Sequence, residues 1–111
     1  MRRARHTDAN HSQIRDLLRQ LGCVVADTSD VGRGFPDLLV KTRLGRVFLV
    51  EVKNPDRPKG RRKLDGQQAE VAALWGESYR VIETEADAIA LACGLDPKFQ
   101  TRLLATIRPA R

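Results

Sequence analysis

Aromatic side chains are scarce in this chain, which has three Phe, one Trp and one Tyr among its 111 residues. Proteins that bind single-stranded nucleic acid without sequence preference stack the bases on aromatic rings. Because the apolar patterns place Phe48 and Trp75 in the core, too few rings remain for such a platform. The scarcity therefore argues against a single-strand-binding module.

Long apolar runs are missing as well. No stretch approaches the roughly 18 apolar residues of a membrane-spanning helix. The basic start of the chain, residues 1–6, is followed by no apolar segment, so we expect no secretory signal and a cytoplasmic location. Only two cysteines occur, Cys23 and Cys93, and we expect both to be reduced core residues. A zinc site built from them and the two histidines would lack the usual ligand spacing.

Positive charge is in excess, because 20 Lys and Arg residues stand against 14 Asp and Glu and give a formal net charge of +6. Such a balance favours nucleic acid or another anionic partner. The length predicts a single domain over residues 1–111 with one modest core. We place that core at about 8–94, followed by a basic tail over 95–111.

The spacing of apolar residues predicts a helix over about residues 9–21, with Asp8 as its N-cap and Gly22 as its C-terminal cap. A short strand over 23–26 and a loop over 27–34 follow. Two further apolar runs, 35–40 and 47–53, flank a turn at Gly45 and read as a hairpin.

The second half of the chain predicts a helix, a strand and a helix. Asp65 opens the first helix, which runs to Trp75 and has Gln68 in capping-box position. A strand over 79–82 precedes a helix between Thr84 and Gly94. Its inner face is expected to carry Ala86, Ile89, Ala90 and Cys93. The order α-β-β-β-α-β-α predicts an α/β fold with a small mixed sheet flanked by helices.

The hairpin brings unusual residues together. If its turn is centred near Leu44, Leu39 faces Leu49 and Asp37 faces Glu51, with Cβ atoms roughly 4.5–5.5 Å apart. Alternation along the strand puts Lys53 on the same face, while the opposite face is apolar. Two buried carboxylates repel each other unless something compensates them, and their oxygens suit Mg²⁺ or Mn²⁺. The simpler alternative is a salt bridge from Lys53 to either carboxylate at a strand edge.

The segments Pro36-Asp37 and Glu51-Val52-Lys53, with the lead-in Gly32-Arg33-Gly34-Phe35, resemble the PD-(D/E)xK nuclease superfamily. Together with residues 8–10 and 22–23 they are similar to its virus-type replication-repair nuclease (VRR-NUC) family over about residues 8–92. The resemblance implies a restriction-endonuclease-like core. It also implies small standalone domains, frequent in phages and bacteria, and hence a bacterial or phage-infected host cell.

The resemblance assigns roles to residues. Asp37, Glu51 and the carbonyl of Val52 are expected to hold the metal, and Lys53 to act on the scissile phosphate. Relatives also carry a glutamate on the first helix. Here Gln13 falls at that place, with Asn10 one turn earlier, and either residue is equally well explained as an ordinary polar residue at a helix start. Gln68 matches a glutamine near the phosphate, and the capping box is an equal alternative.

Basic residues supply candidate DNA contacts. The Pro- and Gly-containing segment after Lys53 reads either as a phosphate clamp, which we favour, or as a solvated loop. Arg33 precedes Asp37 closely enough to reach a phosphate. The expected DNA-binding residues are Arg33, Arg57, Lys59, Arg61, Arg62 and Lys63.

These residues predict Mg²⁺-dependent phosphodiester cleavage, and the resemblance implies a structure-selective DNA endonuclease. From the resemblance we expect a Holliday junction resolvase-like homodimer acting on branched DNA, because resolving a junction takes two symmetric cuts. The alternatives are a DNA-binding module on a nuclease scaffold and a restriction or nicking nuclease. The apolar residues expected at the dimer interface are Val71, Leu74, Trp75, Phe99, Leu103, Leu104 and Ile107.

Overall fold

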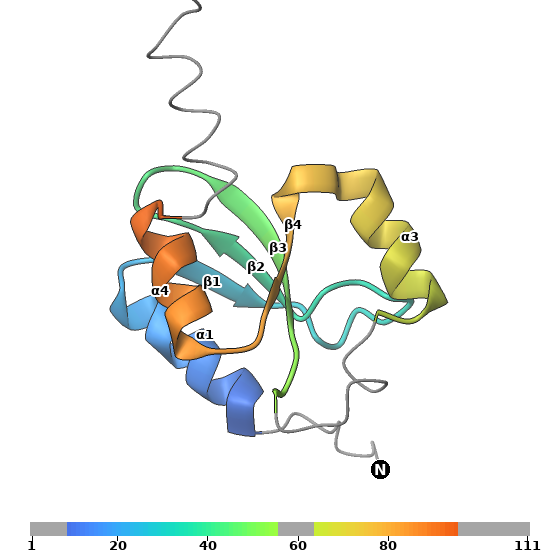
Figure 1. Ribbon diagram of the computed structural model, residues 1–111, viewed down its shortest axis with the longest axis horizontal. Helices are drawn as coiled ribbons and strands as arrows, with labels where there is room; N and C mark the ends of the chain where they lie inside the picture. The colour runs from blue at the N-terminus through green and yellow to red at the C-terminus, as the bar shows by residue number, and fades with distance from the viewer. Residues whose placement is uncertain (1–8, 56–63, 96–111) are drawn as a thin grey trace, which may run out of the picture.

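The computed structural model describes residues 9–55 and 64–95, which form one four-stranded sheet with helices on both faces (Figure 1). The strand order is β1-β2-β3-β4, with the first two pairs antiparallel and β3–β4 parallel. The elements are α1 Ala9–Gln20, β1 Val24–Asp27, β2 Leu38–Lys41, β3 Val47–Val52, α3 Gly66–Trp75, the 3₁₀ turn η1 Gly76–Ser78, β4 Tyr79–Ile82 and α4 Glu85–Cys93.

This architecture confirms the α/β fold and the order α-β-β-β-α-β-α. The expected N-cap Asp8 and the tail 95–111, apart from Leu95, lie outside the described residues. Gly22 follows α1 with a φ of 91°, and a Cβ there would come within 2.3 Å of Cδ of Arg43. Only glycine fits this turn, so the chain can pass directly from α1 into β1.

The hairpin has the register that the sequence predicts. Leu39 pairs with Leu49 and Lys41 with Val47. Because side chains alternate along a strand, this register sends the predicted apolar face inward. On that face the core is formed by Ile14, Leu18, Cys23, Val25, Leu38, Val40, Phe48, Val50, Ile82, Ala88, Leu91 and Ala92.

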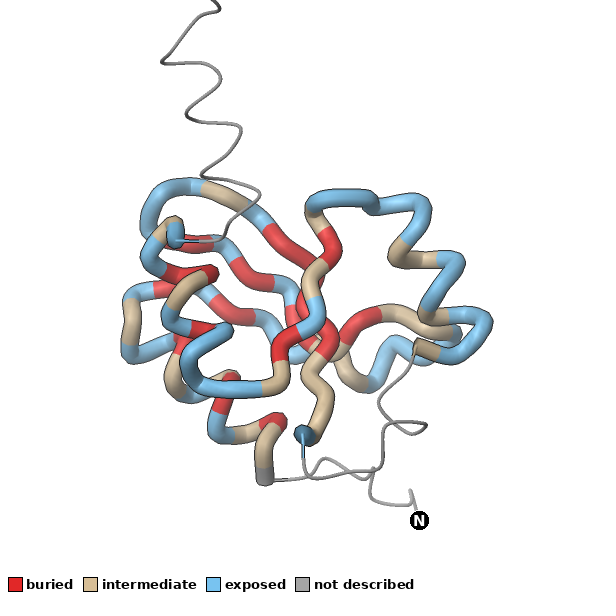
Figure 2. Tube along the Cα trace, viewed as in Figure 1, coloured by how far each residue is buried: buried red, intermediate tan, exposed pale blue. Residues whose placement is uncertain are grey.

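The two faces of the sheet are covered unequally. Helices α1 and α4 lie together on one face and α3 lies on the other (Figure 1). Buried segments gather in the strands and under α1 and α4 (Figure 2). By contrast, none of the ten residues of α3, all of them described, is buried.

The capping box predicted at Asp65 is present, and Thr84, the predicted start of the last helix, forms a second one. The Asp65 side chain caps α3 and the Thr84 side chain caps α4, each with its return contact from the third helical residue. Gly94 ends α4 in the left-handed conformation, with a φ of 77°. The two capping boxes fix where α3 and α4 begin, and Gly94 fixes where α4 ends.

Four burial predictions are wrong. The buried face of α4 carries Ala88, Leu91 and Ala92, whereas Ala86 and Cys93 are exposed and Ile89 is 40% exposed. Helix α4 is apolar on almost every side, so its spacing does not define which face turns inward. Trp75 is 51% exposed, in line with the rest of α3, which buries none of its residues.

No helix in the described ranges is long and apolar enough to cross a membrane.

Candidate active site

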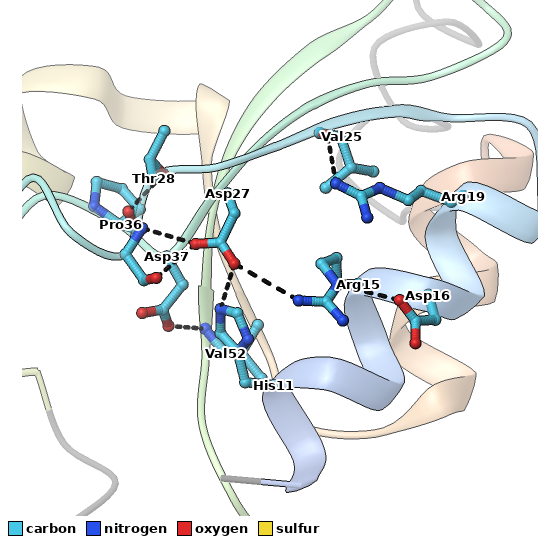
Figure 3. A network of polar contacts seen from close by, with 11 residues as sticks. His11, Arg15, Asp16, Arg19, Val25, Asp27, Thr28, Pro36, Asp37 and Val52 are labelled. Carbon is cyan, nitrogen blue, oxygen red and sulfur yellow. Dashed lines mark hydrogen bonds and ion pairs between the residues drawn. The ribbon is translucent and has the colours of Figure 1, made fainter. Parts of the chain in front are cut away.

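The Pro36-Asp37 pair is fixed where β1 ends and β2 begins. The backbone N–H of Thr28 donates to the Asp37 carbonyl at 2.8 Å, and the Thr28 hydroxyl donates to the Pro36 carbonyl at 2.8 Å. Asp37 Oδ2 in turn accepts a hydrogen bond from the backbone N–H of Val52 at 2.9 Å (Figure 3). The Asp37 carboxylate therefore lies beside the end of β3, as the hairpin register predicts.

Glu51 is the most buried carboxylate of the site, with 5% of the residue exposed. Its Oε2 accepts a hydrogen bond from Nε2 of Gln68 at 2.9 Å and lies 3.4 Å from Nζ of Lys53. Nζ of Lys53 also donates to Oε1 of Gln68 at 3.2 Å. Glu51, Lys53 and Gln68 thus form a closed triangle of contacts between β3 and α3.

Gln68 forms the predicted capping box and also contacts Glu51, whereas its expected role near the phosphate stays a prediction. Its Oε1 accepts from the Asp65 backbone N–H at 3.0 Å and completes the capping box, while its Nε2 donates to Glu51. The amide uses its two ends for the two tasks. The start of α3 and the orientation of Glu51 are therefore coupled through one side chain.

The electrostatic environment disfavours a charge on Glu51. Burial, and then the negative charge of Asp37, raise the pKa of Glu51 to about 7, although Lys53 opposes the shift. Near neutral pH the carboxyl group is therefore divided between its protonated and ionised forms. A divalent cation that replaced the proton would neutralise both carboxylates at once.

The donor set fits such a cation in part. Glu51 Oε1 is buried and has no hydrogen-bond partner among the described residues, as expected of an oxygen kept for a ligand. In the same residues no group of three or more His, Cys, Asp or Glu side chains is arranged to hold a metal ion. The site offers two carboxylates, Asp37 and Glu51, and further ligands would have to be carbonyl or water oxygens.

The two residues that the sequence suggested on α1, Gln13 and Asn10, differ in their surroundings. Gln13 is exposed, and Asn10 donates from Nδ2 to the carbonyls of Lys53 at 2.8 Å and Glu83 at 3.1 Å. Asn10 therefore ties α1 to the ends of β3 and β4 by backbone contacts. The metal role proposed for Gln13 stays a prediction.

His11, which the sequence analysis considered only as an improbable zinc ligand, is the buried polar residue of α1. It is 5% exposed, and its Nε2 lies 3.9 Å from Oδ2 of Asp27, which also lies 3.7 Å from Nη1 of Arg15 (Figure 3). Burial opposes a lower pKa for Asp27, but hydrogen bonds from Ser29 and the charges of His11 and Arg15 lower it. The signal was available, because His11 stands three residues before Ile14 on the inner stripe.

Of the basic residues expected to contact DNA, only Arg33 lies within the described residues. Arg33 is exposed with a φ of 58° between two glycines that also have positive φ, and a Cβ on Gly34 would lie 2.5 Å from the Gln67 backbone. The loop that carries Arg33 therefore packs against the start of α3. The other expected DNA contacts, Arg57, Lys59, Arg61, Arg62 and Lys63, lie outside the described residues. In sequence, the segment 56–63 lies between Lys53 and Gln68.

The arrangement defines a class: an α/β core whose β2–β3 hairpin presents PD and ExK residues at one end of the sheet. A solved structure named "VRR_NUC domain" shares this fold with a TM-score of 0.51 and 24% identity, covering 76% of this chain and 95% of that chain. The chain therefore has the VRR-NUC fold, as the sequence resemblance predicted. No protein-family model and no curated protein matches the sequence.

Proposed function

We propose that this protein is a metal-dependent DNA endonuclease of the PD-(D/E)xK type. The observation that carries the proposal is the state of Glu51. A nearly inaccessible carboxylate next to Asp37 is held through one oxygen by Lys53 and Gln68, while its other oxygen lacks a partner in the described chain. Such an arrangement is costly for stability alone and useful for binding a cation.

Each residue has a distinct task in this proposal. Asp37 and Glu51, with the carbonyl of Val52, hold Mg²⁺ or Mn²⁺. The ion, when bound, polarises a phosphate and makes water a better nucleophile. Lys53 orients Glu51 and supplies a positive charge at the scissile phosphate. Gln68 holds Glu51 and Lys53 together, so that both keep their geometry before substrate arrives.

DNA contacts are proposed on the α3 side of the site. Arg33 reaches the substrate from the loop before Asp37, and Arg57, Lys59, Arg61, Arg62 and Lys63 follow Lys53 in the chain. These contacts would go to phosphates, so they would add affinity without sequence preference.

The preferred substrate in this proposal is branched DNA, such as a Holliday junction, cut by a homodimer with two symmetric sites. This step rests on the resemblance to VRR-NUC proteins. It has support from α3, where Leu74 is 84% and Trp75 is 51% exposed. Apolar side chains exposed together on one element are typical of an interaction surface. The tail residues Phe99, Leu103, Leu104 and Ile107 lie outside the described part of the chain.

A second candidate function follows from the acid missing on α1. With two carboxylates in the described part of the site, metal affinity could be too low for turnover, and the protein would act as a DNA-binding module. A restriction or nicking nuclease is the alternative within enzymes. It would cut linear duplex as readily as a junction.

The deciding experiment incubates the purified protein with Mg²⁺ or Mn²⁺ and a panel of junction, flap, duplex and single-stranded DNA. We expect cleavage that is fastest on the junction and lost in Asp37→Asn and Glu51→Gln, with DNA binding kept. Asp16→Asn, an exposed acid on α1, is the matched control. Binding without cleavage under every condition supports the module, and equal rates on junction and duplex exclude junction selectivity. A mass near 12.4 kDa by light scattering excludes the homodimer.

A further inference from the structure

Tyr79 is the single tyrosine of the chain and lies beneath the candidate active site. It begins β4 and pairs with Leu49 of β3 in a parallel ladder, in which Glu51 pairs with Val81. Residues two apart on a strand share a face. Tyr79 therefore projects from the same face as Glu51, about 7 Å back along the sheet, on the side where α3 lies.

The Tyr79 hydroxyl is a buried polar group that nothing described so far explains. The residue is 7% exposed, and its Oη has no hydrogen-bond partner within the described ranges. Burial raises the pKa of Tyr79 well above its usual range, and the negative charges of Glu51, Asp37 and Asp65 raise it further. The hydroxyl therefore keeps its proton and remains a donor close to these carboxylates.

Glu51 Oε1 is the complementary group. It is a buried acceptor, and like Tyr79 Oη it makes no hydrogen bond with the described residues. Leaving a buried donor and a buried acceptor both unsatisfied reduces stability, because each has lost its hydrogen bonds to water. A water molecule held between two such groups satisfies both, as buried waters commonly do.

We propose that Tyr79 is a positioning residue of the candidate active site, whose hydroxyl holds Glu51 Oε1 through one buried water. Gln68 and Lys53 fix Oε2 from the α3 side, and Tyr79 fixes Oε1 from the sheet. A carboxylate oxygen can accept from this water and still bind a cation, because it has two lone pairs. This inference rests on the proposed metal-binding function of Glu51.

The conservative variant Tyr79→Phe tests the idea, because it removes the hydroxyl and keeps the ring that covers the sheet. We expect its affinity for Mn²⁺ and Mg²⁺, measured by isothermal titration calorimetry without DNA, to fall about tenfold, as for other residues that orient a ligand. The control is Thr42→Val, which removes another buried hydroxyl, one that accepts from the Arg46 N–H at 3.3 Å in the hairpin turn. It should leave the metal affinity unchanged.

A second measurement uses no metal. With one tyrosine in the chain, protein labelled with ¹³C at tyrosine Cζ gives a single NMR signal that reports the hydroxyl. In the presence of a chelator this signal should differ between the wild type and Glu51→Ala, and should be the same in the wild type and Thr42→Val. This comparison tests the contact between Tyr79 and Glu51 even if Tyr79→Phe folds poorly.

The outcomes separate the two proposals. If the wild type binds metal and Tyr79→Phe binds it equally well, Tyr79 only fills space and the inference is overturned, while the metal site stands. An unchanged Cζ signal in Glu51→Ala overturns it as well. If the wild type binds neither ion, the proposed function fails and the role of Tyr79 fails with it.

Discussion

The two faces of the sheet differ in what they bury. Toward α1 and α4, residues such as Leu38, Val40 and Val50 are fully buried and form a largely apolar core. Toward α3 the same strands carry Glu51 and the 39% exposed Leu39. One sheet thus separates the residues that stabilise the fold from those that carry the proposed chemistry.

This separation explains how a small domain tolerates an unfavourable site. A carboxyl group with a pKa raised to about 7 reduces the stability of the ionised protein. Most of the packing that offsets this cost comes from the face toward α1 and α4, because none of the residues of α3, which is described throughout, is buried. Substitutions toward α1 and α4 should therefore lower stability, whereas substitutions toward α3 should lower activity. In one case, Glu51→Gln, a substitution on the α3 side should raise stability.

The largest expected effect is on the α3 face and concerns turnover. Lys53→Ala should lower kcat about 10²–10³-fold, because the lysine charge acts where negative charge develops. Metal affinity should change much less, since Nζ contacts Oε2 of Glu51 and the other carboxylate oxygen is unaffected. Single-turnover kinetics and calorimetric metal titration separate the two effects. A collapse of metal affinity with kcat kept would make Lys53 a structural residue.

The next effect is on the core face and concerns stability. Leu38→Ala should lower the free energy of unfolding by about 2–5 kcal/mol, because Leu38 is fully buried against α1 and α4. Its neighbour Leu39 points to the other face, so Leu39→Ala is the matched control and should cost less than half as much. Urea unfolding of the two variants measures the contrast. Equal costs would show that the faces are not separated as described.

The third effect is a gain in stability, expected when the Glu51 carboxyl group is removed. Glu51 has an ordinary pKa of 4.5, which the fold raises to about 7. Between these values the folded protein binds more protons than the unfolded chain, so stability falls as pH rises through about 7. The loss amounts to about 3 kcal/mol at pH 8. Without metal, Glu51→Gln should be more stable than the wild type at pH 8 and similar to it at pH 4.5. Thermal melts with a chelator across this range would contradict the assignment if both proteins lost stability in parallel.

The sequence was most informative where neighbouring residues decide the structure. The hairpin register follows from Gly45 and the alternation around it, and the starts of α3 and α4 follow from caps spanning three residues. These interactions are short in sequence, so a single chain displays them. They were enough to place Asp37 beside β3 and Lys53 on the face of Glu51.

The errors arose where a residue's environment depends on distant elements. Cys93 and Trp75 have apolar neighbours in sequence, but α4 turns Cys93 outward and the end of α3 leaves Trp75 half exposed. The burial of His11 was not predicted because its partner Asp27 is sixteen positions away and meets it only when α1 packs on the sheet. The contact between Gln68 and Glu51 was not predicted for the same reason, because Glu51 comes from another element.

The smallest expected effect concerns Gln13, which the sequence placed in the metal site. Gln13 is exposed on α1, where water and salt screen an added charge. Gln13→Glu should therefore tighten Mg²⁺ binding less than about threefold, and the gain should vanish at high salt. Calorimetric titration at two salt concentrations measures this, with Asp16→Asn as a charge change on an exposed position of the same helix. A gain of tenfold or more that survives high salt would place residue 13 among the metal ligands. Helix α1 would then supply a third ligand beside Asp37 and Glu51.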